Sequence, residues 1–403
     1  MDFEYYPSKS KPRILFVAPT PPPHAGPENV SAGYLESKQL HSHYEICHLR
    51  SNVNTCNKNK GKIRISSLFR FGFIFIKYIH LLISFKPDAV YTLLAQNRVG
   101  VLRDIIYIYT AYLFKSKIFC TFHGEEFAFF LDRQPDFFRK LIKSALGKID
   151  IMMLQGENLR NQFFDIIPPS KFRIVPNGID LDLFKSYDIK RRKFSSNKNT
   201  VMFLGSLVPS KGFVDLYEVA KDIVKEYKDF NFIFVGEMCD SDYNITHDLS
   251  GRKVPGQVRI INKHPRIKFT GSLYDKDKIE KLFSSDVFVL PSYSESMPIV
   301  VLEAMAAGMP MLLTAVGALP EILREGHNCH FVSPGNREEL KERILKLSAD
   351  VELRKYMSVT NYNLVNNEFS ISRMQDRFLK VFDEIYYPFN EPVEKPKKLA
   401  TVE

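Results

Sequence analysis

The sequence predicts an α/β protein made of two doubly wound parallel-sheet domains. Short apolar runs rich in β-branched and aromatic residues alternate with longer segments of helical periodicity, a pattern typical of parallel sheets covered by helices. The alternation restarts near residue 200, and 403 residues exceed the roughly 250 to 300 at which a single hydrophobic core stops growing. Hydrophobic residues make up 45% of the chain, which excludes a disordered chain and can fill two cores.

The predicted strands divide into two sets. Those in the first half are 13–18, 43–49, 89–94, 117–122, 149–154 and 172–175. Those in the second half are 200–204, 231–235, 267–269, 287–290, 311–314 and 329–332. Because open parallel sheets bind ligands outside the carboxyl ends of their strands, two such domains predict an enzyme with an interdomain cleft.

Composition outside the strands sets the expected domain bounds. We expect a first domain at 1–181, a linker at 182–199, a second domain at 200–369, a helix at 370–389 and a disordered tail at 390–403. The linker is polar, and its basic cluster Lys190, Arg191, Arg192 and Lys193 indicates a solvated connector rather than a nucleic-acid site.

Cysteine spacing and apolar runs indicate the compartment. The five cysteines form no C-x-x-C pair, so neither a disulfide framework nor a zinc site is expected, and a reducing compartment fits best. No secretory signal is recognisable, and the apolar stretches 68–85 and 105–114 are too interrupted or too short to span a membrane. We expect core helices at both and a cytoplasmic protein. Arg64, Arg70 and Lys77 leave open a helix lying on an anionic membrane at the inner face.

The net charge of +10 favours anionic partners. Phosphates, nucleic acid and an acidic membrane face would all satisfy it, but nucleic acid is supported only by the charge and the basic cluster in the linker. A nicotinamide-dependent enzyme is disfavoured because the proline-rich segment 19–26, and no G-x-G-x-x-G, follows the first strand.

The segment 287–310 carries the most specific chemistry. A strand should end at Leu290, and a helix should begin between Ser296 and Pro298 and stop at Gly308. The first N–H groups of that helix and its positive dipole end form a phosphate site. Glu295 and Glu303 would repel phosphate unless they face hydroxyl groups, which a nucleotide sugar supplies. The alternative is a helix-end charge at Glu295 and a solvated Glu303.

The spacing of these two glutamates resembles a known signature. Glu295, seven intervening residues and Glu303, within P-S-x-x-E-S-x-P and L-E-A-M-A-x-G-x-P, are similar to family 4 of the retaining glycosyltransferases, which have the GT-B architecture. Further matches are 176–180 (P-N-G-I-D), Gly205-x-Leu207, Lys211-Gly212, Phe269-Thr270-Gly271, Gly317, Glu321 and the run 326–335. The first half matches loosely, through 19–26 and His123-Gly124-x-Glu126.

The resemblance implies roles for particular residues. Lys211 would neutralise the donor diphosphate, Glu303 would bind ribose, and Glu295 and His123 would hold the transferring sugar; the catalytic residues are thus His123, Lys211 and Glu295. The implied donor-binding residues are Gly26, Gly205, Ser206, Lys211, Thr270, Gly271, Leu273, Glu295, Met297, Pro298, Ile299, Val300 and Glu303. Glu125 and Glu126 are acceptor-binding candidates that the sequence does not separate. The first domain would bind the acceptor, the second the nucleotide sugar, and the last helix would cross back to the first domain.

The expected function is a retaining transfer of a sugar from a nucleoside diphosphate sugar, UDP- or GDP-linked, to a glycan or lipid-linked acceptor in surface polysaccharide or glycolipid biosynthesis. No metal and no cofactor are expected, because Lys211 and the helix end supply the positive charge. Ser206 departs from the family, which commonly has a basic residue there; the alternative is a catalytically weak binding subunit that acts with a partner transferase. Gly236-Glu237-Met238 also departs, and 239–265 has no assigned role.

Overall fold

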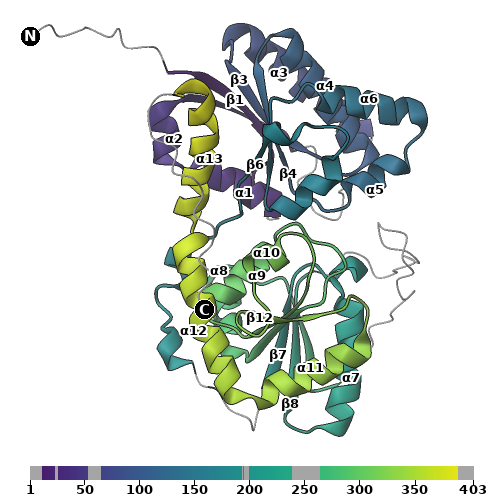
Figure 1. Cartoon of the computed structure of the whole chain (residues 1–403), viewed down its shortest axis with the longest axis vertical. Helices are drawn as coiled ribbons and strands as arrows, with labels where there is room; N and C mark the ends of the chain where they lie inside the picture. The colour runs from purple at the N-terminus through teal and green to yellow at the C-terminus, as the bar shows by residue number, and fades with distance from the viewer. Residues whose placement is uncertain are drawn as a thin grey trace, which may run out of the picture.

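The chain folds into two α/β domains that lie one above the other (Figure 1). The structure is a computed structural model, and it describes residues 11–22, 26–52, 65–192, 194, 199–237 and 264–388. Two six-stranded sheets lie in these segments, with strand orders β2-β1-β3-β4-β5-β6 and β12-β11-β10-β7-β8-β9. Every strand pair in them is parallel. The predicted fold class is confirmed.

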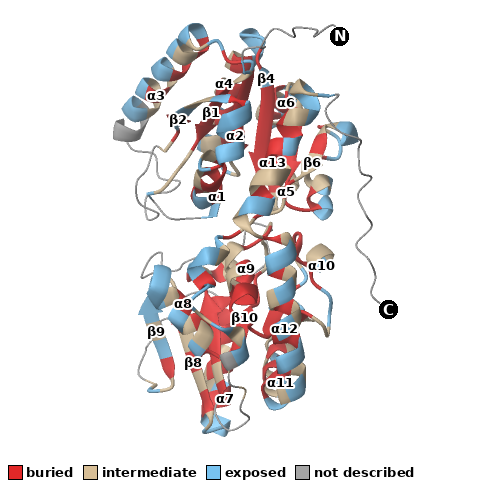
Figure 2. Ribbon diagram, turned by 90° about the vertical axis from the view of Figure 1, so that its left-hand side faces the viewer, coloured by how far each residue is buried: buried red, intermediate tan, exposed pale blue. Residues whose placement is uncertain are grey.

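The strands of the first sheet are β1 (Arg13–Ala18), β2 (Glu45–Arg50), β3 (Ala89–Leu94), β4 (Lys117–Phe122), β5 (Ile151–Leu154) and β6 (Phe172–Ile174). Its helices are α1 (Gly26–Leu35), α2 (Lys38–His43), α3 (Ile65–Ser84), α4 (Arg98–Leu113), α5 (Phe127–Asp132) and α6 (Asp136–Leu146). All six residues of β3 are buried, because helices cover both faces of the sheet (Figure 2).

The strands of the second sheet are β7 (Asn199–Leu204), β8 (Phe230–Val235), β9 (Ile267–Gly271), β10 (Val287–Leu290), β11 (Met311–Thr314) and β12 (Cys329–Val332). Its helices are α7 (Phe213–Glu226), α8 (Asp275–Ser284), α9 (Ile299–Ala306), α10 (Leu319–Ile322), α11 (Arg337–Ala349) and α12 (Val351–Glu368). Each predicted strand overlaps an observed one, with small differences at the ends. The predicted tail at 390–403 and most of 239–265 lie outside the described residues.

The last helix, α13 (Ile371–Tyr386), returns to the first domain. Phe378 stacks on Tyr34 of α1 with ring centroids 3.8 Å apart, and Phe382 stacks on Phe119 of β4 at 4.2 Å. Aromatic pairs of this kind are worth about 0.5–1.5 kcal/mol beyond their buried area. The crossover that the resemblance implied is confirmed.

The sequence predicted that the basic cluster of the linker is solvated, but one of its residues, Arg192, is hydrogen-bonded to the second domain. Arg192 donates hydrogen bonds to the carbonyls of Ala307 (3.1 Å), Leu282 (2.7 Å) and Ser285. Burial lowers the pKa of Arg192 to about 10. The correction has a simple cause: three carbonyl groups near the ends of α8 and α9 lack helical partners, and a guanidinium can satisfy all three.

The apolar run 68–85 forms an amphipathic helix. Ile74, Tyr78 and Leu82 of α3 recur every four residues and are buried, as expected of a core helix. The opposite face exposes Phe69, Phe73, Ile76 and Ile83. In the described part of the chain, no helix combines the length and apolar character needed to cross a bilayer.

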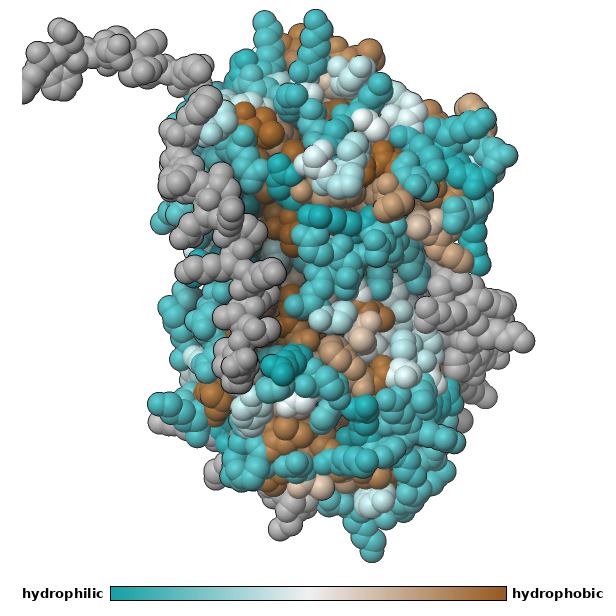
Figure 3. All heavy atoms as spheres, in the orientation of Figure 1, coloured by the Kyte–Doolittle hydropathy of each residue, from teal (hydrophilic) through white to brown (hydrophobic). Residues whose placement is uncertain are grey.

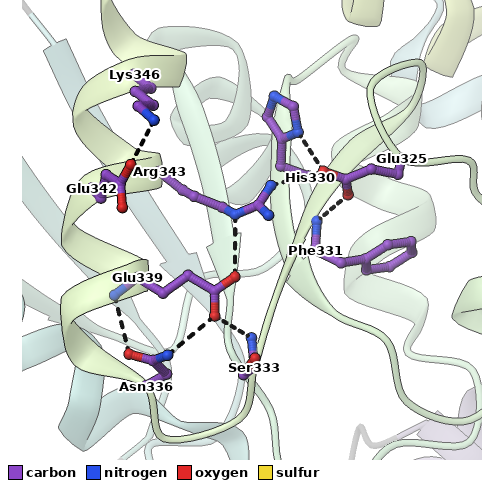
Figure 4. A network of polar contacts seen from close by, with 9 residues as sticks. All are labelled: Glu325, His330, Phe331, Ser333, Asn336, Glu339, Glu342, Arg343 and Lys346. Atoms are coloured by element: carbon purple, nitrogen blue, oxygen red, sulfur yellow. Dashed lines mark hydrogen bonds and ion pairs between the residues drawn. The ribbon is translucent and has the colours of Figure 1, made fainter.

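A polar network fastens α11 to the loop that follows β12 and to the turn before that strand (Figure 4). Glu325 accepts hydrogen bonds from His330 Nδ1 (2.8 Å), Phe331 N (2.6 Å) and Arg343 (2.7 Å). Burial opposes ionisation of Glu325, but these donors outweigh it and lower its pKa. His330 and Phe331, within the run 326–335, thus belong to a structural network.

Candidate functional site

The loop that follows β10 is held against the turn that precedes α7. Gly212 has a φ of +69°, and a Cβ there would stand 2.0 Å from the carbonyl oxygen of Pro291, so only glycine permits this approach. Tyr293 N donates to Ser210 O (2.8 Å), and Thr314 of β11 donates to Ser292 O (2.6 Å). These contacts bring the lysine before Gly212 to the loop that carries Glu295.

Lys211 and Glu295 form an ion pair. Lys211 Nζ lies 2.5 Å from Glu295 Oε1, and the Ser292 hydroxyl donates to the same oxygen at 3.0 Å. Gly205 has a φ of +152°, and a Cβ there would be 3.4 Å from Lys211 Cδ. Three predicted donor-site residues, from the ends of β7 and β10, therefore meet at one place.

Glu303 of α9 has its own lysine partner. Lys278 of α8 lies 2.6 Å from Glu303 Oε1, and both side chains are mostly buried. The sequence did not single out Lys278 among the lysines of α8, because only the packing of α8 beside α9 selects it. Each carboxylate of the signature thus faces a cation.

Helix α9 begins beside the start of α1. Pro298 precedes Ile299 without a side-chain cap, which leaves the helix end open to an anion. A Cβ on Gly26, the first residue of α1, would be 4.0 Å from Ile299 Cδ1. The helix starts later than Ser296, and Met297 is buried: its carbonyl oxygen and sulfur accept hydrogen bonds from Asn177 of the first domain. Val300 follows Ile299 in the first turn of α9.

The remaining donor-site candidates lie along the same carboxyl edge of the second sheet. Thr270 and Gly271 end β9 and are exposed, and Leu273 follows them, partly buried. Gly236 N donates to Gly271 O at 2.9 Å, which joins the ends of β8 and β9. Ser206 is exposed at the end of β7. These residues border the site but make no described contact with the Lys211–Glu295 pair.

His123 follows β4 at the facing edge of the first sheet. Its Nε2 atom is buried and has no hydrogen-bond partner among the described residues. Burial lowers the pKa of His123 to about 4, so the imidazole is neutral near pH 7. A neutral ring with an unused nitrogen can bind a ligand hydroxyl.

The two acceptor candidates have different surroundings. Glu125 accepts hydrogen bonds from Glu295 N (2.7 Å) and Gly317 N (2.8 Å), so both of its oxygens contact the second domain. Burial raises the pKa of Glu125. Glu126 precedes α5 and is half-buried. The contact of Glu125 with the second domain was not predicted, and acceptor binding by either glutamate stays a prediction.

Comparisons with known proteins agree with this geometry. Residues 185–363 match the family described as glycosyl transferases group 1. This match covers all of β7 to β12, so the resemblance lies in the second domain. Sucrose-phosphate synthase from Thermosynechococcus elongatus superposes with a TM-score of 0.72 at 16% identity over 94% of this chain and 100% of that chain. Anabaena HepE, in complex with UDP and glucose, superposes with a TM-score of 0.65 at 15% identity. The superposition covers 92% of this chain and 99% of that chain. These likenesses confirm the GT-B fold.

Curated relatives match the chain less completely than these structures do. N-acetyl-alpha-D-glucosaminyl L-malate synthase of Bacillus anthracis is 24% identical over 77% of this chain and 74% of its own length. UDP-Gal:alpha-D-GlcNAc-diphosphoundecaprenol alpha-1,3-galactosyltransferase of Escherichia coli is 26% identical, but the match spans 54% of this chain and 55% of its own.

A polar residue beside His123 escaped the sequence analysis, whereas buried Asn177 belongs to the 176–180 motif. Gln155 directly follows β5, is 1% exposed, and neither atom of its amide has a partner among the described residues. Thr121 pairs with Met153 between β4 and β5, so continuing the register puts Gln155 beside His123. Asn177 follows β6 and is also buried. The available signal was a polar residue placed directly after an apolar strand.

Proposed function

We propose that this glycosyltransferase moves a sugar from a nucleoside diphosphate sugar to a glycan or lipid-linked acceptor with retention of configuration. The ion pair of Lys211 and Glu295 beside the uncapped start of α9 carries the proposal. A cation and a helix N-terminus suit a diphosphate, and a carboxylate beside them suits sugar hydroxyls.

The pair also suggests how the donor would bind. Lys211 neutralises the mostly buried Glu295 carboxylate. A diphosphate would draw the ammonium group away and free Glu295 to accept hydrogen bonds from the sugar. Glu303, which pairs with Lys278, would accept hydrogen bonds from the ribose. UDP is the first nucleotide to test, because HepE is described in complex with UDP and the Escherichia coli relative is named for UDP-Gal.

The chemical step breaks the bond between the sugar C1 and the diphosphate oxygen and forms a bond from C1 to the acceptor oxygen on the same face. The acceptor proton passes to the departing phosphate oxygen, so the protein supplies no dedicated base. Lys211 and the dipole of α9 stabilise the negative charge that develops on the diphosphate, a role that needs no metal ion. Neutral His123 would hold a hydroxyl of the transferring sugar.

We further propose that the acceptor is presented at the anionic inner face of the cytoplasmic membrane. The exposed face of α3 carries Phe69 (77% exposed) and Ile76 (68%), and hydrophobic atoms reach the outer surface there (Figure 3). Lys77 lies 4.5 Å from the ring of Phe73, so cationic and aromatic groups alternate along the helix. Apolar groups interleaved with cations are the pattern of a helix that lies on anionic lipid.

Substituting Lys211 tests the proposal. With Lys211→Ala, turnover of the sugar donor should fall by roughly 100-fold or more, because the leaving charge loses its cation. Lys346→Ala removes an exposed lysine of α11 and serves as the matched control. Steady-state rates at saturating donor, with the anomeric configuration of the product read by NMR, give the answer. Full turnover by the variant would place the diphosphate elsewhere, and a wild-type chain that binds UDP but never turns over would favour a binding subunit.

A further inference from the structure

Two carboxylates join the domains, one from each side. Glu125 of the first domain accepts hydrogen bonds from Glu295 N and Gly317 N of the second, at 2.7 and 2.8 Å. Glu321, in α10 of the second domain, accepts hydrogen bonds from Glu157 N and Asn158 N of the first, at 2.7 and 2.6 Å. Each carboxylate therefore binds a pair of backbone N–H groups of the opposite domain.

Glycines permit the close approach that these bonds need. A Cβ on Gly156 would stand 2.6 Å from Ala318 Cβ and 2.9 Å from Glu321 Oε1. Gly317 has a φ of +57°, and a Cβ there would be 2.0 Å from Glu295 O. Any larger residue would push the two domains, or the two loops of the second domain, apart.

The energetics favour both contacts. Hydrogen bonds to an ionised acceptor are roughly twice as strong as neutral ones, and a carboxylate with two donors also has a defined orientation. Glu157 begins a short 3₁₀ helix (Glu157–Phe163), so Glu321 meets N–H groups that the helix itself leaves unused. Asn177 adds a third link through its 2.8 Å hydrogen bond to Met297 O.

We propose that Glu125 and Glu321 form a reciprocal latch that holds the two domains closed, and that Glu125 is a positioning residue for Glu295. Glu125 binds the backbone N–H of the residue whose carboxylate faces Lys211, so closing the cleft fixes the loop that carries Glu295. The latch rests on the interdomain contacts alone, whereas the positioning role rests on the proposed function.

The test uses the full chain with Glu125→Gln, Glu321→Gln and their combination. Glutamine keeps one acceptor oxygen but turns an NH2 group toward a backbone N–H. Each substitution therefore breaks one of the two hydrogen bonds that the carboxylate accepts, and the side chain keeps its size. Glu157→Gln is the control, because it changes a side chain that pairs with Arg160 and leaves the backbone donor in place.

Small-angle scattering measures closure directly. The double variant should have a larger radius of gyration than the wild type and the control, both free and with UDP. Equal radii for the double variant, the wild type and the Glu157→Gln control would overturn the latch. Because this readout needs no turnover, it decides the latch even if the wild type binds no nucleotide, a result that would reject the proposed function alone.

The positioning role predicts a division between binding and rate. Glu125→Gln should change the dissociation constant for UDP by no more than about twofold and lower kcat by about 10- to 100-fold, since a small misplacement of a sugar-binding group has that effect. An equal loss of UDP affinity and kcat, or an unchanged kcat, would overturn this role for Glu125.

Discussion

At the scale of single residues, the site is organised by the pairing of each signature glutamate with a lysine. The two ion pairs are Glu295 with Lys211 and Glu303 with Lys278, and their charges cancel. Partly buried charges are tolerable only when paired, and each pair also holds its two side chains in a defined orientation. Removing one partner should therefore change ligand affinity more than it changes the fold.

Glu303→Ala should weaken UDP binding about tenfold or more, because hydrogen bonds to a charged group contribute roughly 1.5–3 kcal/mol. Isothermal titration of UDP into the variant and into Glu342→Ala, an exposed glutamate of α11, measures the difference. An unchanged affinity would remove Glu303 from the ribose site.

His123 should make stability depend on pH. Its pKa of about 4 in the folded chain lies below the ordinary value of 6.5, so between these values the unfolded chain takes up a proton that the folded chain does not. Stability is thus fully present above pH 6.5 and is lost as pH falls toward 4, by roughly 2 kcal/mol at pH 5. Denaturant unfolding of the wild type and His123→Asn at pH 7 and pH 5 measures the contribution of His123 to the pH dependence of the free energy of unfolding. Parallel pH dependence in both proteins would contradict the assignment.

At the scale of elements, continuous apolar runs predicted the strands well because parallel strands are buried on both faces, as in β3 and β4. The sequence singled out Glu295, Glu303 and Lys211 because their motifs follow strands, and their roles in donor binding stay predictions. Lys278, Gln155 and the contacts of Glu125 were not found, because each depends on which element packs against which. Arg192 was misjudged for the same reason: a basic cluster has no periodicity to show which member is buried.

The network on α11 gives a prediction at this scale. Glu325→Gln should destabilise the second domain by about 1 kcal/mol, since three donors lose a charged acceptor that is partly screened by solvent. Glu342→Gln, on the exposed side of the same helix, should change stability by less than about 0.5 kcal/mol. Thermal unfolding of both variants checks this, and equal melting temperatures would show that the network contributes nothing.

At the scale of the whole molecule, the carboxyl edges of the two sheets face each other, and α12 and α13 run along one side of the two domains (Figure 1). Loops after β4, β5 and β6 contact loops after β10 and β11, and His123 lies in the first of these loops. The exposed face of α3 lies at the far end of the first domain, away from the second. The proposed membrane contact of α3 would therefore leave the contact region between the domains free.

Binding to liposomes should therefore depend on lipid charge and on salt. Sedimentation with anionic vesicles should exceed that with neutral vesicles and should decline as salt rises, because each well-placed Lys or Arg contributes about 1 kcal/mol. Phe69→Ser with Ile76→Ser should reduce binding to anionic vesicles. Equal sedimentation with neutral and anionic lipid would reject the membrane contact.

The most direct test of the central claim is a crystal structure of the chain with UDP. The proposed site predicts the diphosphate between Lys211 Nζ and the first N–H groups of α9, with the ribose hydroxyls on Glu303 and the Lys211–Glu295 pair opened. UDP bound elsewhere, or in the cleft with that ion pair intact, would contradict the assignment of the donor site.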